Sequence, residues 1–325
     1  MGKITGKSIL ITGGAGFIGS HLVDTIIAGR PSQLIVVDNL FLGKKKNLSE
    51  AFKKNSSKLI FLYQDASDFK TMEAICYKYD IEVVFNLAVI PLPTSLEKPK
   101  WTVDQNILIT TTLCQLAKDH AFETLIHFSS SEALGSAKSV PMHEDHLLSP
   151  LTPYAASKAA CDHIVLSYHE TFGIDVAILR PFNNYGPRQN DKAYAGVIPI
   201  VIKKVFNGEP IEIHGDGEQT RDFLYVKDTA EAAVTMYKCI ETRGRVINIA
   251  SGKEASVNEL VKMVLRIMNA ESHPVKHVAP RPADVRRHCG DITKAKKLFG
   301  FQPKIALTEG LKSTVDYYLQ QFKLG

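Results

Sequence analysis

A glycine-rich turn at residues 13–19 narrows the choice of folds more than any other segment of this chain. It follows an apolar run at 8–12, which is typical of a buried strand, and it opens a helical pattern over 17–28. Glycines in such a turn let the backbone approach a pyrophosphate, and the free amides at the helix N-terminus favour its negative charge. The turn therefore predicts a dinucleotide site, which includes Gly13, Gly16, Phe17, Ile18 and Gly19.

An acidic residue follows the next predicted strand, where a dinucleotide site of this kind needs one. The apolar run 34–37 ends in Asp38, about 20 residues beyond the glycine turn. A carboxylate at this place accepts hydrogen bonds from a ribose diol and repels a 2′-phosphate. Asp38 therefore predicts that the cofactor is NAD rather than NADP.

Short apolar runs alternate with helical patterns through the first half of the chain. Because this alternation is typical of right-handed βαβ units, the sequence predicts an α/β fold with a Rossmann-type, doubly wound parallel sheet. After Pro181, loops rich in Asn, Gly and Pro indicate a smaller α/β lobe that binds the substrate. We expect residues 1–180 to form the NAD-binding domain and residues 181–325 to form this lobe, partly intertwined with the first domain. The predicted strands are 8–12, 34–37, 59–63, 83–85, 124–128, 176–179, 211–213 and 246–249, and the predicted helices are 17–28, 72–79, 102–119, 154–171, 198–207, 226–239, 257–268 and 307–320.

The composition argues against several other classes of protein. Of the 325 residues, 45% are hydrophobic and 22% are charged, as in an ordinary globular chain, and no apolar stretch is long enough to predict a membrane span. A net charge of +5 is too small to indicate a nucleic-acid partner. The five cysteines are widely spaced and odd in number, which favours free thiols in the cytoplasm. His143 and His146 lack a third ligand at suitable spacing, so we expect no metal site.

Two segments carry side chains suited to proton transfer. Tyr154 and Lys158 lie four residues apart in a helical pattern, so they share one face of the helix. A neighbouring ammonium should lower the pKa of the phenol, which could then take a proton from a hydroxyl that is being oxidised. Ser130 follows the predicted strand 124–128, and a hydroxyl at the carboxyl end of a strand could share that hydrogen bond.

Taken together, these residues resemble the extended short-chain dehydrogenases that act on nucleotide sugars, and the resemblance covers nearly the whole chain. It implies a catalytic set of Ser130, Tyr154 and Lys158, and a structural role for Asn106. The further cofactor contacts that it implies are Asn39, Asp65, Ala66, Leu87 and Ala88, besides Asp38, Tyr154 and Lys158. The substrate contacts that it implies are Ser130, Asn183, Arg188, Val197, Arg221, Arg281 and Asp284, with the arginines placed on the sugar diphosphate.

Within this family the sequence leaves the reaction open. The segments 197–199 and 281–285 are most similar to those of UDP-hexose 4-epimerases, so the leading hypothesis is an epimerase that transiently oxidises C4 of a UDP-hexose with bound NAD. The run from Ser130 to Glu132 is more similar to decarboxylases and some dehydratases, which makes a UDP-sugar 4,6-dehydratase or a UDP-glucuronate decarboxylase using Glu132 the alternative. A non-catalytic NAD-binding regulator is the remote alternative. The resemblance also implies a homodimer, built on helices near 102–119 and 154–171.

Overall fold

The computed structural model describes residues 3–55, 57–191, 196–280 and 285–324. Its centre is a seven-stranded sheet in the order β11-β6-β5-β4-β1-β2-β3, and every pairing in it is parallel. The order reverses direction beside β1, as in a doubly wound fold, which confirms the predicted fold class. The strands are β1 (Ser8–Thr12), β2 (Gln33–Val37), β3 (Leu59–Leu62), β4 (Val83–Asn86), β5 (Thr124–Phe128), β6 (Asp175–Pro181) and β11 (Val246–Ile249).

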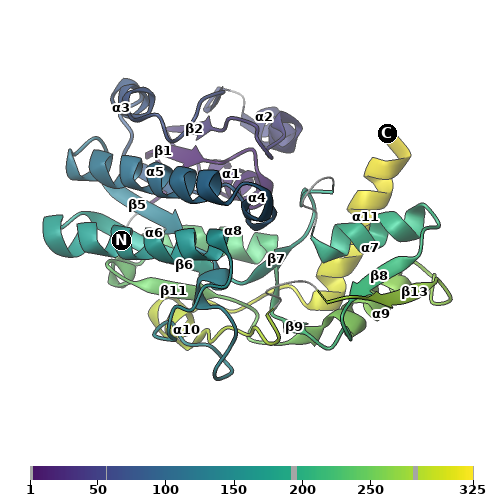
Figure 1. Ribbon diagram of the computed structural model, residues 1–325. Coiled ribbons are helices and arrows are strands. Elements are labelled where there is room, and N and C mark those ends of the chain that lie inside the picture. The colour runs from purple at the N-terminus through teal and green to yellow at the C-terminus, as the bar shows by residue number, and fades with distance from the viewer. Residues whose placement is uncertain (1–2, 56, 192–195, 281–284, 325) are drawn as a thin grey trace.

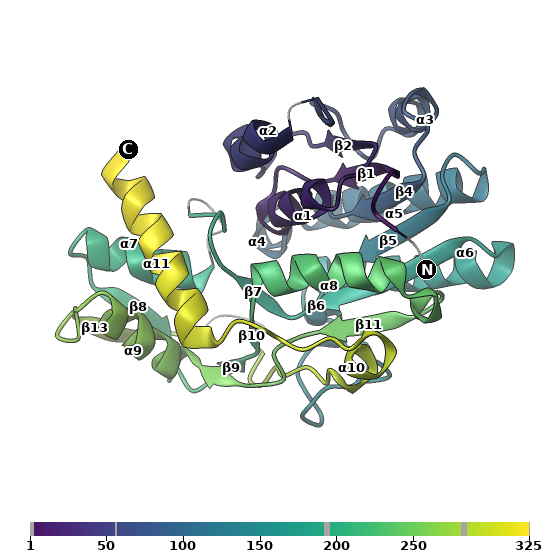
Figure 2. The same ribbon diagram turned by 180° about the vertical axis from the view of Figure 1, so that it is seen from behind.

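Helices cover both faces of this sheet (Figures 1 and 2). Alternate strand residues point to opposite faces, and β1 contributes Ile9 and Ile11 to one buried cluster and Leu10 to the other. Strands buried on both faces read as continuous apolar runs, which is why the sequence predicts them well. One face carries α1 (Phe17–Ala28), α2 (Ser49–Asn55), α8 (Val226–Lys238) and α10 (Thr293–Phe299), and the other carries α3 (Phe69–Lys78), α5 (Pro99–Lys118) and α6 (Pro153–Phe172).

A smaller lobe lies beyond the carboxyl end of the sheet and has its own buried cluster, which α7, α9 and α11 enclose (Figure 1). Its strands form three pairs, β7 with β10, β9 with β12, and β8 with β13. The elements are β7 (Asn183–Tyr185), α7 (Val197–Phe206), β8 (Ile211–His214), β9 (Thr220–Arg221), β10 (Phe223–Tyr225), β12 (Ala255–Ser256), α9 (Val257–Ile267), β13 (Val275–Val278) and α11 (Leu307–Leu324), and the short remaining helices of the chain are η1 (Lys45–Leu48), α4 (Leu92–Glu97), η2 (Ser131–Leu134) and η3 (Ile240–Thr242).

Two elements that follow residue 181 in the chain return to the larger sheet. Strand β11 pairs with β6, and helix α8 packs against α1 and adds Ala230, Ala233 and Met236 to the first cluster. The chain therefore crosses between the two parts several times after Pro181. No helix in the described ranges is both long and apolar enough to cross a membrane.

The helix that carries Tyr154 has clear local signals at both ends. Thr152 caps its N-terminus by accepting a hydrogen bond from the amide of Ala155 at 3.2 Å, and Pro153 occupies the first turn. Gly173 ends the helix with a left-handed φ of 70°. These signals fix where α6 begins, so Tyr154 and Lys158 lie in its first two turns, beside the carboxyl ends of the strands.

Candidate active site

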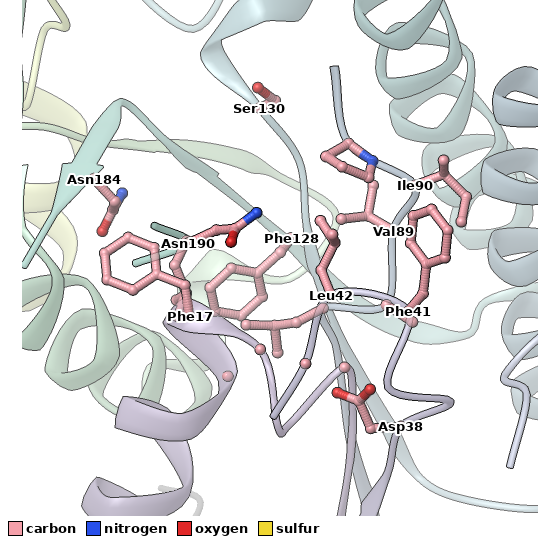
Figure 3. Close-up of a pocket in the computed structure, with 18 of the residues that line it drawn as sticks. Phe17, Asp38, Phe41, Leu42, Val89, Ile90, Phe128, Ser130, Asn184 and Asn190 are labelled. Atoms are coloured by element: carbon pink, nitrogen blue, oxygen red, sulfur yellow. The ribbon is translucent and has the colours of Figure 1, made fainter. Parts of the chain in front are cut away.

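A long pocket runs over the carboxyl edge of the sheet, next to the point where the strand order reverses. Open α/β sheets bind their ligands at this position. Its walls come from the glycine turn, the loops after β2, β3, β4, β5 and β6, and helix α6. In Figure 3, Asp38 lies at one end of the labelled side chains and Ser130 at the other, with Phe17, Leu42 and Phe128 between them.

The glycine turn fits the close approach that a dinucleotide requires. Gly13 has a φ of +68°, and a Cβ built on it would lie 2.7 Å from the amide nitrogen of Ala88. A Cβ on Gly19 would lie 2.2 Å from the carbonyl oxygen of Gly13. No side chain larger than hydrogen fits at either position without moving backbone, so the cradle for a pyrophosphate is kept open.

Asp38 lines the pocket and also holds the turn in place. Its carboxylate accepts hydrogen bonds from the amides of Ala15, at 2.9 Å, and Leu40, at 2.8 Å. Burial raises the pKa of Asp38, and these backbone donors oppose the rise. A Cβ on Gly43 would lie 2.7 Å from the carboxylate, so this glycine leaves the space that Asp38 occupies. The lone pairs that remain suit the hydroxyls of a ribose.

A second polar group lies farther along the same wall. Asn39 donates from Nδ2 to Asp65 at 3.1 Å, and Asp65 also accepts hydrogen bonds from the amide and hydroxyl of Ser67. The structure brings every sequence-predicted cofactor residue to the pocket wall, namely Gly13, Gly16, Phe17, Ile18, Gly19, Asp38, Asn39, Asp65, Ala66, Leu87, Ala88, Tyr154 and Lys158.

The predicted proton-transfer groups meet at the far end of the pocket. Ser130 caps the short helix η2 by accepting a hydrogen bond from the amide of Glu132 at 3.2 Å, and it lines the pocket together with Tyr154. Burial raises the pKa of Tyr154 to about 12, the nearby hydroxyl of Ser130 opposes this, and the charge of Glu132 adds to it. The phenol is therefore protonated at neutral pH.

The prediction that Lys158 lowers the pKa of Tyr154 below its usual value is wrong for this structure. The Lys158 ammonium donates to the carbonyl oxygen of Phe128 at 2.5 Å, and burial lowers its own pKa. Burial dominates at both residues, and it works against the charged form of each. A phenolate at Tyr154 thus needs a further positive charge nearby, which is what the nicotinamide ring of NAD⁺ carries.

Besides Ser130, which lines the pocket, the predicted substrate residues divide into three groups. Asn183 and Arg188 line the pocket, and Arg188 also pairs with Asp24 of α1 at 2.8 Å. Val197 and Arg221 do not line it, and Arg221 donates to the carbonyl of Val285 at 2.6 Å. Arg281 and Asp284 lie outside the described residues.

A buried asparagine ties the pocket wall to the catalytic helix. Asn106 of α5 accepts from the amide of Ile90 at 2.7 Å and donates to the hydroxyl of Ser157 at 2.9 Å. This gives Asn106 the structural position that the sequence resemblance implies. It also links the loop after β4 to Ser157 of α6, the residue that precedes Lys158.

Several residues that line the pocket are not predicted from the sequence. They are mostly apolar, and an apolar residue in a loop carries no sign of whether it faces a ligand or a core. Position after a strand was the one usable signal, since Phe41, Leu42, Val89 and Ile90 follow β2 and β4. The missed residues include Phe41, Leu42, Val89, Ile90, Phe128 and Asn190.

Comparison with known proteins adds independent evidence. The family model described as GDP-mannose 4,6 dehydratase matches residues 10–314. A Methanocaldococcus jannaschii protein, provisionally named a UDP-glucose 4-epimerase, is 37% identical over 311 residues, which are 95% of this chain and 97% of that protein.

Solved structures agree in fold. The Thermotoga maritima UDP-glucose 4-epimerase with UDP-glucose has a TM-score of 0.90 at 34% identity and covers 97% of this chain and 99% of its own. The Streptomyces venezuelae dTDP-glucose 4,6-dehydratase with bound NAD has a TM-score of 0.91 at 29% identity and covers 98% of each chain.

These comparisons confirm the predicted fold class, the NAD cofactor and the enzyme class. Their spread over epimerases and dehydratases also matches the alternatives that the sequence left open. The chain belongs to the GDP-mannose 4,6 dehydratase family, within the extended short-chain dehydrogenases, and it is an NAD-dependent enzyme of the epimerase and dehydratase type.

Proposed function

We propose that this enzyme is a UDP-hexose 4-epimerase. The observation that carries the proposal is that Ser130 and Tyr154 lie together at the end of a pocket whose other end is a dinucleotide cradle. A sugar C4–OH group bound there could give its hydroxyl proton to Tyr154 and the hydride on C4 to the cofactor. The similarity to proteins named UDP-glucose 4-epimerases favours this reaction and a UDP-hexose as its substrate.

Each of the three catalytic residues then has a distinct task. Tyr154 takes the proton from the C4 hydroxyl, and Ser130 shares the hydrogen bond to the reacting oxygen. Lys158 holds a positive charge near the phenol and orients it. NAD⁺ supplies the hydride acceptor for C4. Rotation of the 4-keto sugar in the pocket would present its opposite face for return of the hydride to C4, while Tyr154 would return the proton to the oxygen.

Binding of the sugar diphosphate is assigned to the smaller lobe. Asn183 supports this assignment, because its side-chain oxygen is buried at the pocket and has no hydrogen-bond partner among the described residues. Arg188 supports it by its place on the same wall, although it would share its charge with Asp24. Val197, Arg221, Arg281 and Asp284 remain proposed contacts. For Val197 and Arg221, which do not line the pocket, contact would require the lobe to close over the nucleotide.

One observation favours a second reaction. The carboxylate of Glu132 lines the pocket next to Ser130 and acts electrostatically on Tyr154. A carboxylate there could remove the C5 proton of a 4-keto sugar, which is the step that begins loss of water from C6. A dehydratase or decarboxylase that uses Glu132 is therefore the second candidate.

Product analysis by NMR separates these reactions. The protein is incubated with UDP-glucose, UDP-galactose, their N-acetyl forms and UDP-glucuronate. Interconversion of two epimers without loss of mass supports the proposal. A product lighter by water or by carbon dioxide replaces it with the second candidate. No turnover by protein that binds NAD would instead indicate a regulator.

Three further assignments accompany the proposed activity. Residues 1–180 would bind NAD and residues 181–325 the nucleotide sugar, with α8 and β11 serving the larger sheet. The buried, free state of all five cysteines supports a reducing compartment, and hence the cytoplasm.

The third assignment is a homodimer formed by the outer faces of α5 and α6. On these two helices, Leu113, Leu116 and Val165 belong to the core, whereas Leu108 is 46% exposed. Phe172, at the end of α6, is 50% exposed. Light scattering of the protein and of Leu108→Glu tests the assignment, since the charge should give monomers. A monomeric wild-type protein would contradict it.

A further inference from the structure

Asp162 is a buried carboxylate on α6, the helix that carries Tyr154 and Lys158. It lies one turn after Lys158 on the same face of α6, and its side chain is 2% exposed. One carboxylate oxygen, Oδ2, accepts from the hydroxyl of Ser129 at 2.7 Å and from the guanidinium of Arg180 at 2.9 Å. A buried carboxylate keeps its charge only when it is paired in this way.

These two bonds join the three segments that carry the active site. Ser129 directly follows β5 and precedes Ser130, while Arg180 lies near the end of β6 and precedes Asn183 in the chain. Asp162 itself belongs to the helix of Tyr154 and Lys158, which lies along these strands (Figure 1). The amide of Ser129 also donates to the carbonyl of Leu179 at 2.8 Å, so the two strand ends are held in register.

We propose that Asp162 is a positioning residue for the reaction. It fixes the position of Ser130 relative to Tyr154, and its negative charge stabilises the charged form of Lys158. This rests on the proposed function only for the choice of substrate. The geometry matters because a catalytic pair must be held closely, and a displacement of about 1 Å can cost about a hundredfold in rate. Ser129 and Arg180 would transmit the effect without touching the reacting atoms.

The charges that act on the pair come from several elements. Lys158 is affected by Asp162 and Cys161 of its own helix, which raise its pKa against the lowering by burial, and its charge in turn acts on His127 of β5. Tyr154 is affected by Glu132 of η2 and by Cys161 and Asp162. Arg180 of β6 neutralises part of the Asp162 charge. Removal of the negative charge at Asp162 should lower the pKa of both Lys158 and Tyr154.

The chain contains a matched control at the other end of the same strands. Asp175 of β6 accepts from the hydroxyl of Thr124 of β5 at 2.6 Å and pairs with Arg243 at 2.7 Å. The partners are of the same kind as at Asp162, a hydroxyl and an arginine, although Asp175 is 36% exposed. Asp175 lies five residues before Arg180, about 16 Å along the strand, so its loss should affect stability alone.

The test compares Asp162→Asn and Asp175→Asn in the full-length protein. For Asp162→Asn we expect kcat to fall about tenfold or more with little change in KM, and the pH profile of kcat/KM to move to lower pH by about half a unit or more. For Asp175→Asn we expect an unmoved profile. If both variants lose stability and neither profile moves, Asp162 is a structural residue and the inference is overturned.

Two further measurements keep the inference testable. Should Asp162→Asn fail to fold with Arg180 unpaired, Ser129→Ala removes one bond to Asp162 without changing any charge. It should lower kcat about threefold to tenfold, and a wild-type kcat would overturn the inference. If the wild-type protein converts no UDP-hexose, the proposed function fails instead. In that case a ¹³C NMR titration of the Tyr154 ring, assigned with Tyr154→Phe, tests the inference. The pKa of Tyr154 should be lower in Asp162→Asn than in the wild-type protein, and an equal pKa would overturn the inference.

Discussion

Glu132 and Tyr154 line the same pocket, and the carboxylate of Glu132 raises the pKa of the Tyr154 phenol. For an enzyme that needs a phenolate, this charge works against catalysis. For an enzyme that removes a proton from C5 of a keto sugar, the same carboxylate would be the base. Glu132 is therefore the residue at which the two candidate reactions predict opposite results.

Glu132→Gln removes the charge and keeps the shape of the side chain. In an epimerase we expect turnover to persist and the acid limb of the pH profile to move to lower pH, because the pKa of Tyr154 falls. In a dehydratase or decarboxylase that uses this base, turnover should fall by about 10² to 10⁴. Steady-state rates of wild type and variant across the pH range distinguish the two outcomes.

Tyr154→Phe removes the proton acceptor without disturbing the packing of the ring. We expect turnover to fall by about 10² to 10⁴ while NAD binding persists, since the ring remains in place. Tyr168→Phe is the matched control on the same helix, because its hydroxyl only donates to Gln115 at 3.4 Å, away from the pocket. Comparable activity of Tyr154→Phe and Tyr168→Phe would contradict the assigned role of Tyr154.

The sequence predicts the larger sheet well because its central strands are buried on both faces and read as continuous apolar runs. Residues 8–12 and 17–28 are assigned with the bounds that the structure gives to β1 and α1. The short helices α2, α4 and α10 were missed. They have few buried positions, and α4 contains Pro93 in its first turn, so neither periodicity nor composition marks them.

The sequence predicts the cofactor end of the candidate site better than the catalytic end and the substrate side. Glycine spacing marks the cofactor end, because it reflects backbone contacts that only glycine allows. The direction of the Tyr154 pKa was not accessible, since it depends on burial and on where the Lys158 ammonium finds an acceptor. The pairing of Arg188 with Asp24 depends on how the second lobe packs on α1, which no local pattern reveals.

Gly13→Ala tests whether the turn must stay free of side chains. Gly173 is a matched control, since its φ of +70° is almost that of Gly13, but a Cβ there would meet nothing within 4 Å. Gly173→Ala should cost about 1 kcal/mol of unfolding free energy from backbone strain alone. Gly13→Ala should cost more and weaken NAD binding at least tenfold, measured by calorimetry. Equal effects of the two substitutions would show that the contact with Ala88 does not matter.

Asp38→Asn tests the preference for NAD. The amide keeps an acceptor for Ala15 or Leu40 but no longer repels a 2′-phosphate. We expect affinity for NAD to fall and the ratio of NADP affinity to NAD affinity to rise about tenfold or more. Titration of both dinucleotides measures this ratio. An unchanged ratio would mean that another group excludes the phosphate.

His21 gives a prediction for stability against pH. It lies buried on α1, and its Nε2 is 2.9 Å from the carbonyl oxygen of Pro187, across the junction with the smaller lobe. Burial lowers the pKa of His21 to about 3, and the hydrogen bond to Pro187 only partly opposes this. The ring is therefore neutral in the folded protein at neutral pH, and its Nε2 carries the hydrogen that it donates.

Below about pH 6.5 the unfolded chain binds a proton at His21 that the folded chain does not, so stability falls as the pH falls towards the folded pKa. Between pH 7 and pH 5 this histidine should remove about 2 kcal/mol of unfolding free energy. His21→Gln keeps a donor for Pro187 but does not titrate. Denaturant unfolding at both pH values should therefore show a loss that is about 2 kcal/mol smaller in the variant. Equal losses in both proteins would mean that His21 titrates alike in the folded and unfolded chain.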